Sequence, residues 1–161
     1  MSNKIIEFYS GTGTDHAGRK IETIWGWNED KLERCHDYIQ WLFPNRDRSA
    51  YNEHAPLMTD EVSRQFKMSP WLQGRALRSF ETICRFYGVI YDEKHTFDFG
   101  KERPWWESER YAHNWLRMTR ILLALPDFGL HANAQGFYEV IMKANVPQRT
   151  KDFWASASRR S

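Results

Sequence analysis

Apolar residues recur at helical spacing over most of this chain. The clearest run follows Ser69-Pro70, where serine favours a helix N-cap and proline suits the first helical position. One apolar stripe then carries Leu72, Ala76, Leu77, Phe80, Ile83, Cys84 and Tyr87 and ends at Gly88. Glycine at that point is typical of a left-handed cap at a helix C-terminus. The pattern therefore predicts an amphipathic helix between Ser69 and Gly88.

The same spacing predicts the rest of the fold. Further helices are expected at about residues 28–43, 59–66, 104–125, 132–144 and 147–157, with a helical turn at 21–25 and a short helix or strand within 1–9. Polar or glycine-rich loops separate them at 10–18, 45–58 and 92–103. No strand pattern exceeds a few residues, so we predict an all-α, single-domain bundle of about five to seven helices over residues 1–157. A frayed basic tail is expected at 158–161.

Composition and charge narrow the function classes. The 161 residues are 41% hydrophobic and 16% aromatic, with eight tryptophans, which excludes a wholly disordered chain. A formal net charge of only +2 argues against a surface built throughout for nucleic acid. Cys35 and Cys84 are expected to be reduced core thiols, with a disulfide between them as the alternative. No stretch approaches the ~18 apolar residues that span a bilayer, so we expect a cytoplasmic protein, or a nuclear one in a eukaryotic host.

Familiar catalytic and cofactor motifs are missing from the sequence. Gly11, Gly13 and Gly18 do not have the GxGxxG spacing of a phosphate-binding loop, so a flexible loop is the favoured interpretation. The six histidines form no HxxxH or HExxH pattern, and no serine lies in a GxSxG context. We therefore predict no cofactor, no metal and no enzymatic activity, with a metal held by distant loops as the alternative.

A polar stripe lies on the helix expected at 104–125. It is formed at spacings of three and four, roughly opposite the apolar face, by Arg110, His113, Arg117 and Arg120. Such a stripe is either a solvated, salt-bridged face or a surface for phosphate, nucleic acid or an acidic peptide. A second, similar stripe is formed by Arg75, Arg78 and Arg85.

Three motifs follow one another along the chain: HDYIQWLFP at 36–44, FYGV at 86–89 and HNWLRMTRIL at 113–122. Together with Phe8-Tyr9 and the segment 21–27, they resemble the conserved domain of the opioid growth factor receptor family. The resemblance implies an α-helical fold, and it does not imply enzymatic activity. For the animal receptors it implies binding of an enkephalin-type peptide that restrains proliferation at the nuclear envelope and in the nucleus. We expect a domain-only, stand-alone member without the acidic, repeat-containing extension of the longer receptors.

The matching motifs single out the candidate binding residues Tyr38, Gln40, Trp41, His113, Asn114, Arg117 and Arg120. The aromatic surplus and the resemblance predict a peptide or protein partner, bound in an aromatic groove near Trp41 with His113 and Arg117 at its rim. Gln40 and Asn114 are either donors into that groove or locks between helices, because a buried amide must find partners. His36 and Gln40, at i and i+4, form either a ligand patch or a solvated helix face. The alternative function is anion or nucleic-acid binding through the arginine stripes, with an affinity that falls steeply as salt rises.

Overall fold

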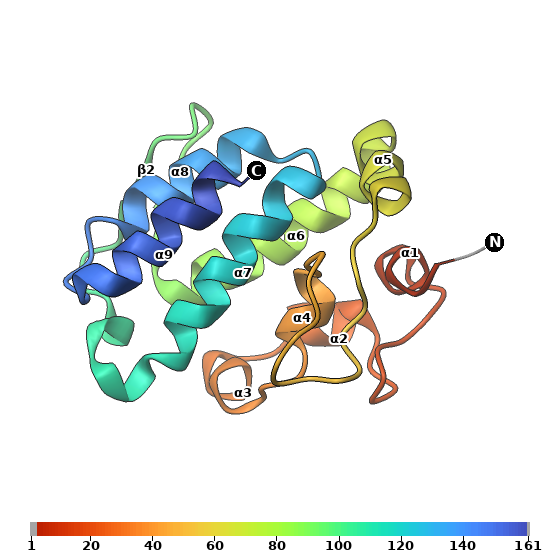
Figure 1. Cartoon of the computed structure of the whole chain (residues 1–161), viewed down its shortest axis with the longest axis horizontal. Helices are drawn as coiled ribbons and strands as arrows, with labels where there is room; N and C mark the ends of the chain where they lie inside the picture. The colour runs from red at the N-terminus through yellow and green to blue at the C-terminus, as the bar shows by residue number, and fades with distance from the viewer. Residues whose placement is uncertain (1–2, 161) are drawn as a thin grey trace.

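The computed structural model describes residues 3–160, and most of them are helical (Figure 1). The helices in that range are α1 (Lys4–Ser10), α2 (Ile21–Trp25), α3 (Glu29–Arg34), α4 (Ile39–Leu42), α5 (Asp60–Met68), α6 (Pro70–Tyr87), α7 (His113–Asp127), α8 (His131–Ile141) and α9 (Gln148–Arg159). The other regular elements are strands β1 (Val89–Tyr91) and β2 (Phe97–Phe99) and the 3-10 helices η1 (Trp105–Glu107) and η2 (Glu109–Tyr111). The predicted all-α class is confirmed. Several helices are short, so there are more of them than the five to seven expected.

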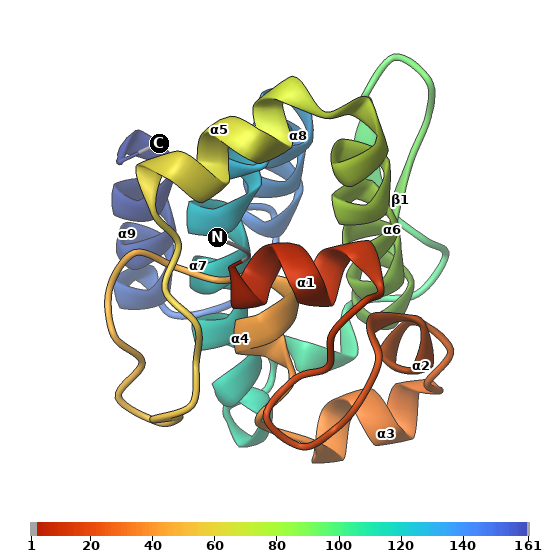
Figure 2. The ribbon, with the colours of Figure 1, turned by 90° about the vertical axis from the view of Figure 1, so that its right-hand side faces the viewer.

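The longer helices form one block, and the short N-terminal helices lie against it. Helix α7 packs against α5, α8 and α9, while α6 packs against α1, α2 and α5. Figure 1 shows α6 (green) and α7 (cyan) through the centre, with α8 and α9 (blue) on one side and α1 to α4 (red to orange) on the other. In the view turned by 90°, α1 lies at the front, with α5 above it and α2 and α3 below it (Figure 2). Helix α7 therefore has neighbours on both sides.

Helix α6 follows its sequence prediction closely. Ser69 Oγ accepts a hydrogen bond from the backbone of the first helical turn at 3.1 Å, and Gly88 adopts the left-handed conformation with φ of 73°. Phe80 is fully buried, with its ring 6.0 Å from that of Phe97 and 5.7 Å from that of Phe137. Bulky rings supply much of the core; buried examples are Trp106, Trp154, Tyr9, Tyr38, Tyr87, Phe8, Phe43, Phe66 and Phe128.

The helix expected over residues 28–43 is interrupted. It begins at the N-cap Asn28 as predicted, but α3 ends at Arg34 and α4 starts only at Ile39. Cys35 is extended, with φ of −87° and ψ of 127°, so the helical hydrogen bonds cannot continue through it. The carbonyls at the end of α3 are thereby left for other donors.

The helix expected from Pro104 to residue 125 is also shorter at its start. Two 3-10 turns come first, and the α-helix begins at His113. Trp106 in the first turn is fully buried and donates its indole N–H to Tyr87 O at 3.0 Å, which ties this segment to the end of α6. At its other end, α7 continues through Pro126, because a proline in the last turn removes only one helical donor.

Both chain ends and one loop also differ from expectation. Residues 89–91 and 97–99, expected within loop, form an antiparallel hairpin in which Val89 faces Phe99. Residues 4–10 are helical, which resolves the choice between helix and strand there. The frayed tail was a wrong prediction for its first residues, since α9 reaches Arg159 and Arg160 Nη2 lies 3.3 Å from Asp47 Oδ2. Ser161 and residues 1–2 lie outside the described part of the chain.

Candidate binding pocket

Arg117, predicted to lie on an open polar stripe, is buried and bonded to backbone carbonyls. Only 5% of it is exposed. Its Nη1 donates to Leu32 O at 3.0 Å, and its Nη2 donates to Cys35 O at 2.8 Å and to Glu33 O at 3.4 Å. These oxygens belong to the end of α3, where no further helical N–H is available to them. Arg117 therefore caps α3 from α7, and its interpretation as part of a solvated stripe is wrong.

Asn114 and Tyr38 complete the same network. Asn114 is fully buried, accepts from the Tyr87 hydroxyl at 3.0 Å and donates to Glu33 Oε1 at 3.1 Å. The Tyr38 hydroxyl donates to Leu32 O at 2.9 Å, and burial raises the pKa of Tyr38 well above its ordinary value. Asn114 thus joins α3, α6 and α7. Of the two interpretations offered for this amide, the structural lock is the one that its contacts match.

Trp41 does not form the wall of a groove. It is only 4% exposed, its indole N–H donates to His16 Nδ1 at 3.1 Å, and its ring meets that of Phe8 edge-on at 5.4 Å. The ring therefore packs into the core beside α1 and the loop that follows it. The expectation of an aromatic groove at Trp41 is wrong.

A pocket of about 450 Å³ instead opens between α4, the loop at 45–51 and the first half of α7. Four of the seven predicted residues line it, namely Gln40, His113, Arg117 and Arg120. The other lining residues are His36, Ile39, Asn45, Arg48, Ser49, Ala50, Tyr51, Leu116 and Thr119. Within the part of the chain that the structure describes, the lining contains arginines and histidines but no aspartate or glutamate. The remaining three predicted residues, Tyr38, Trp41 and Asn114, lie in the core behind or beside it.

Arg120 is a partly buried arginine of the lining whose hydrogen bond goes to a backbone carbonyl. It is half-buried, and its Nη1 donates to Phe43 O at 3.1 Å. Burial lowers the pKa of Arg120 to about 10, because removing a cation from water disfavours its charged form. The guanidinium is still protonated at neutral pH. Arg48, on the loop that forms the other side of the pocket, is exposed.

Side-chain amides hold that loop in place. Asn52 Nδ2 donates to Gln40 Oε1 at 3.3 Å, and Gln40 Nε2 donates to His36 O, also at 3.3 Å. Asn45 Nδ2 donates to Arg120 O at 3.1 Å. Gln40 therefore links α4 to the loop, and it also lines the pocket. The loop is tied to α4 at one end and to α7 at the other.

Two histidines lie at the α3 end of the pocket. The rings of His36 and His113 are 5.3 Å apart, and His113 Nε2 is 2.8 Å from Glu33 Oε1. Partial burial, followed by the nearby charges of Arg117 and His113, lowers the pKa of His36. His36 and Gln40 both line the pocket, although residue 36 precedes α4 instead of lying on a continuous helix with Gln40.

Sequence reasoning missed the apolar rim of the pocket. Tyr51 is 83% exposed and Leu116 is 57% exposed. Leu116 lies outside the apolar stripe of α7, one turn from both His113 and Arg120. A leucine on this polar face was therefore a sequence signal for an exposed apolar residue at the site. Nothing in the polar run at 45–58 distinguished Tyr51 or Arg48.

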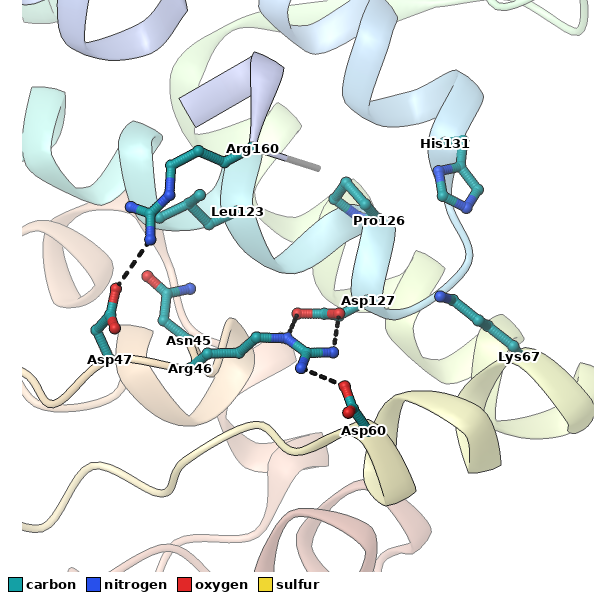
Figure 3. A pocket seen from close by; sticks show the side chains of 10 residues that line it. All are labelled: Asn45, Arg46, Asp47, Asp60, Lys67, Leu123, Pro126, Asp127, His131 and Arg160. Atoms are coloured by element: carbon teal, nitrogen blue, oxygen red, sulfur yellow. Dashed lines mark hydrogen bonds and ion pairs between the residues drawn. The ribbon is translucent and has the colours of Figure 1, made fainter. Parts of the chain in front are cut away.

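A second pocket, of about 300 Å³, is crossed by ion pairs (Figure 3). Arg46 Nη2 lies 2.8 Å from Asp127 Oδ1, and its Nη1 lies 2.5 Å from Asp60 Oδ1. Figure 3 also shows Arg160 reaching Asp47 from α9. These pairs connect the loop after α4 to α5, α7 and α9. We interpret this pocket as a structural junction.

The second arginine stripe does not contribute to the 450 Å³ pocket. Arg75 pairs with Glu22 at 2.5 Å, and its guanidinium lies 5.0 Å from the ring centres of Trp25 and Trp71. Arg85 donates to a backbone carbonyl of residue 27 at 2.9 Å. The two stripes therefore do not meet in one groove.

Three further observations concern the described residues as a whole. Cys35 and Cys84 are free thiols, as expected. Within residues 3–160, no group of three or more histidine, cysteine or acidic side chains is placed to hold a metal ion. Over the same range, none of the helices combines the length and the apolar character that crossing a membrane requires.

Comparison with known proteins identifies the family. The sequence matches the model of the opioid growth factor receptor conserved region over residues 4–154. It is 38% identical over 112 residues to the opioid growth factor receptor of Homo sapiens, and this match covers 66% of this chain and 16% of that protein. The match to the Mus musculus receptor is 37% over 120 residues, covering 70% of this chain and 19% of that protein. The Mus musculus opioid growth factor receptor-like protein 1 is 29% identical over 130 residues, and the match covers 78% of this chain and 28% of that protein.

The chain thus spans less than a third of the length of each of these relatives. No solved structure shows a significant match. The family match nevertheless extends from α1 into α9 and includes both walls of the pocket. The resemblance carried by the three motifs is confirmed, and the chain belongs to the opioid growth factor receptor conserved-region family.

Proposed function

We propose that this domain is a non-enzymatic binding module that recognises a peptide or protein partner in the pocket between α4, the loop at 45–51 and α7. The observation that carries the proposal is a pocket whose lining combines exposed apolar side chains with arginine and histidine side chains. Tyr51 and Leu116 are exposed apolar side chains at one opening, and the volume of about 450 Å³ lies in the usual range for ligand pockets. Exposed tyrosine and leucine beside a pocket suit the anchoring side chains of a partner.

Family membership supports the same class of partner. Two of the relatives are named opioid growth factor receptors and a third is named a receptor-like protein. From those names we extend to this chain only the class of ligand, a peptide or protein, which the geometry of the pocket also suits. An enkephalin-type peptide is the first candidate. Two free thiols suit a reducing compartment, so we place this binding in the cytoplasm, or in the nucleus of a eukaryotic host.

Peptide binding with rim variants tests this proposal. The full chain is titrated with an enkephalin-type peptide and with peptides selected on it from a random display library. The variant carrying Tyr51→Ala and Leu116→Ala is expected to bind about tenfold or more weakly, because truncated anchors typically cost more than ~1 kcal/mol. The matched control is Ile90→Ala, since Ile90 is 58% exposed but lies on β1 away from the pocket lining. Equal affinities of all three proteins for every peptide would rule out this pocket.

A further inference from the structure

We propose that the pocket recognises an anionic group of its partner, a carboxylate or phosphoryl group on a peptide, and that Arg120 binds it. This inference rests on the proposed function and adds the chemistry of the ligand. It excludes a partner that enters the pocket with an apolar side chain alone. The charges of the pocket, the contacts of its arginines and the placement of its rim support it in turn.

The charge of the pocket has one sign. Arg48, Arg117 and Arg120 line it together with two histidines, and no acidic residue does. The carboxylate of Glu33 lies outside the lining, where it contacts His113 at 2.8 Å and lies 3.8 Å from Arg117 Nη1. An approaching anion therefore meets an attractive field without a repelling carboxylate in the lining.

Arg120 differs from the other arginines of limited exposure. Among the described residues these are Arg19, Arg75, Arg117 and Arg120. The first three each have a carboxylate oxygen within 4.0 Å, supplied by Asp15, Glu22 and Glu33 respectively. Arg120 has none, although burial has already removed part of its hydration and lowered its pKa. A half-buried cation without a counter-ion is the condition that a bound anion relieves.

The guanidinium of Arg120 also has unused donors. A guanidinium carries five N–H groups, and the hydrogen bond identified for Arg120 within residues 3–160 is the one from Nη1 to Phe43 O. Its backbone position is fixed from the other side, because Arg120 O accepts from Asn45. A planar carboxylate or a phosphoryl group suits the remaining fork, since both accept two parallel N–H bonds. Arg117 contributes positive field but few free donors, because it is bonded to the end of α3.

The rim makes a peptide a better fit than a long nucleic acid. Leu116 lies one turn before Arg120 on α7, so an apolar side chain and an anion next to each other on a partner reach both. Nucleic-acid binding draws on several phosphate contacts along an open basic surface. Here the second arginine stripe is engaged elsewhere, and Arg117 is buried. We therefore assign an acidic or phosphorylated peptide.

The test compares three forms of one peptide on the folded full chain. The forms are an enkephalin-type peptide with a free C-terminal carboxylate, its C-terminal amide, and the amide carrying a phosphotyrosine. We expect the two anionic forms to bind wild type, and Arg120→Gln to weaken them by about tenfold to a hundredfold, the range of a charge-assisted hydrogen bond. Arg120→Lys, which keeps the charge but not the fork, should fall between. Arg110→Gln is the matched control, since Arg110 is an exposed arginine outside the lining.

A second measurement keeps the two proposals separate. Side-chain NMR of the arginine Nε–Hε groups is recorded during titration with sodium acetate and with inorganic phosphate. A saturable shift of one signal that disappears in Arg120→Gln supports the anion site even if no peptide binds. If instead all three peptides bind wild type and Arg120→Gln equally while the rim variant loses them, the pocket is right and the anion assignment is wrong. An oligonucleotide that binds in preference to every peptide, through Arg120, overturns the peptide assignment. Thermal melts of each variant exclude loss of fold.

Discussion

Arg117 and Arg120 lie one turn apart on the same helix, yet they do opposite things. Arg117 turns toward α3, where its guanidinium meets the carbonyls of Leu32 and Cys35 at 3.0 and 2.8 Å. Arg120 turns toward the loop at 45–51, where the structure gives it the carbonyl of Phe43 and no carboxylate. One side of α7 is therefore a closed junction and the other an open pocket. The difference separates an arginine whose donors satisfy the end of another helix from a half-buried arginine without a carboxylate partner, to which we assign the proposed anion.

The largest expected effect follows from opening the closed junction. Arg117→Met keeps much of the side-chain volume but removes the hydrogen bonds that Arg117 donates to the end of α3, together with the cation 3.8 Å from the Glu33 carboxylate. We expect a loss of about 3 kcal/mol or more in the free energy of unfolding, which corresponds to a fall of roughly 6 to 12 °C in the melting temperature. Chemical denaturation followed by tryptophan fluorescence measures it.

The control for that variant is Arg110→Met. Arg110 is exposed, and its identified contact is with the ring of the adjacent Tyr111 at 5.1 Å. Its loss should change the free energy of unfolding by less than about 0.5 kcal/mol. If both variants unfold at the same denaturant concentration, Arg117 is not a cap and the contrast between the two sides of α7 fails.

The same contrast shows how far the sequence was sufficient. Helix α6 was predictable because all of its signals are local: a serine cap, a proline start, one apolar stripe and a terminal glycine. The break after Arg34 was not, because residues 28–43 keep helical spacing throughout. At the break, the side chains of Arg117 and Tyr38 donate hydrogen bonds to the backbone carbonyls that the end of α3 leaves free. Such a long-range cap leaves no mark in a local pattern.

The site followed the same rule. The motifs brought together Gln40, His113, Arg117 and Arg120, and the structure places all four at one pocket. Spacing alone could not distinguish the buried Arg117 from Arg120. The two residues are three positions apart and therefore lie on nearly the same side of the helix. What separates them is the end of α3, which contacts Arg117. The motif and the aromatic surplus pointed to Trp41, but large aromatic rings pack into a core as readily as they line a groove, and this one is in the core.

A smaller effect, of opposite sign, is expected on the open side. Arg120→Met removes a half-buried cation that has no counter-ion, and Phe43 O keeps a donor because Asn45 Nδ2 lies 3.4 Å from it. The protein should therefore be as stable as wild type or more stable, by up to about 1 kcal/mol. Denaturation measured as for Arg117→Met makes the comparison direct. A loss of 2 kcal/mol or more in the free energy of unfolding would show that Arg120 is a structural residue, in the same class as its neighbour.

The smallest expected effect is a titration at the point where the two sides meet. His36 lines the pocket, and its Nδ1 lies 3.3 Å from Arg117 Nη2. Because partial burial and the positive charge of Arg117 disfavour its protonated form, its pKa should lie below the ordinary 6.5. The folded state then binds this proton less readily than the unfolded chain. The small contribution of His36 to stability is therefore complete above pH 6.5 and is lost as the pH falls through its folded-state pKa.

NMR titration of the His36 ring signals measures that pKa directly. His113→Asn removes another cause of the depression, so the pKa of His36 should rise toward 6.5 in that variant without disturbing the bonds of Arg117 to α3. Protonation also adds positive charge to a pocket that lacks acidic lining residues. Binding of an anion at Arg120 should consequently raise the pKa of His36, because each of the two charges favours the other. If phosphate binds saturably while the pKa of His36 stays fixed, the anion occupies a place outside the field of this ring, and the predicted coupling between the two sides of α7 is wrong.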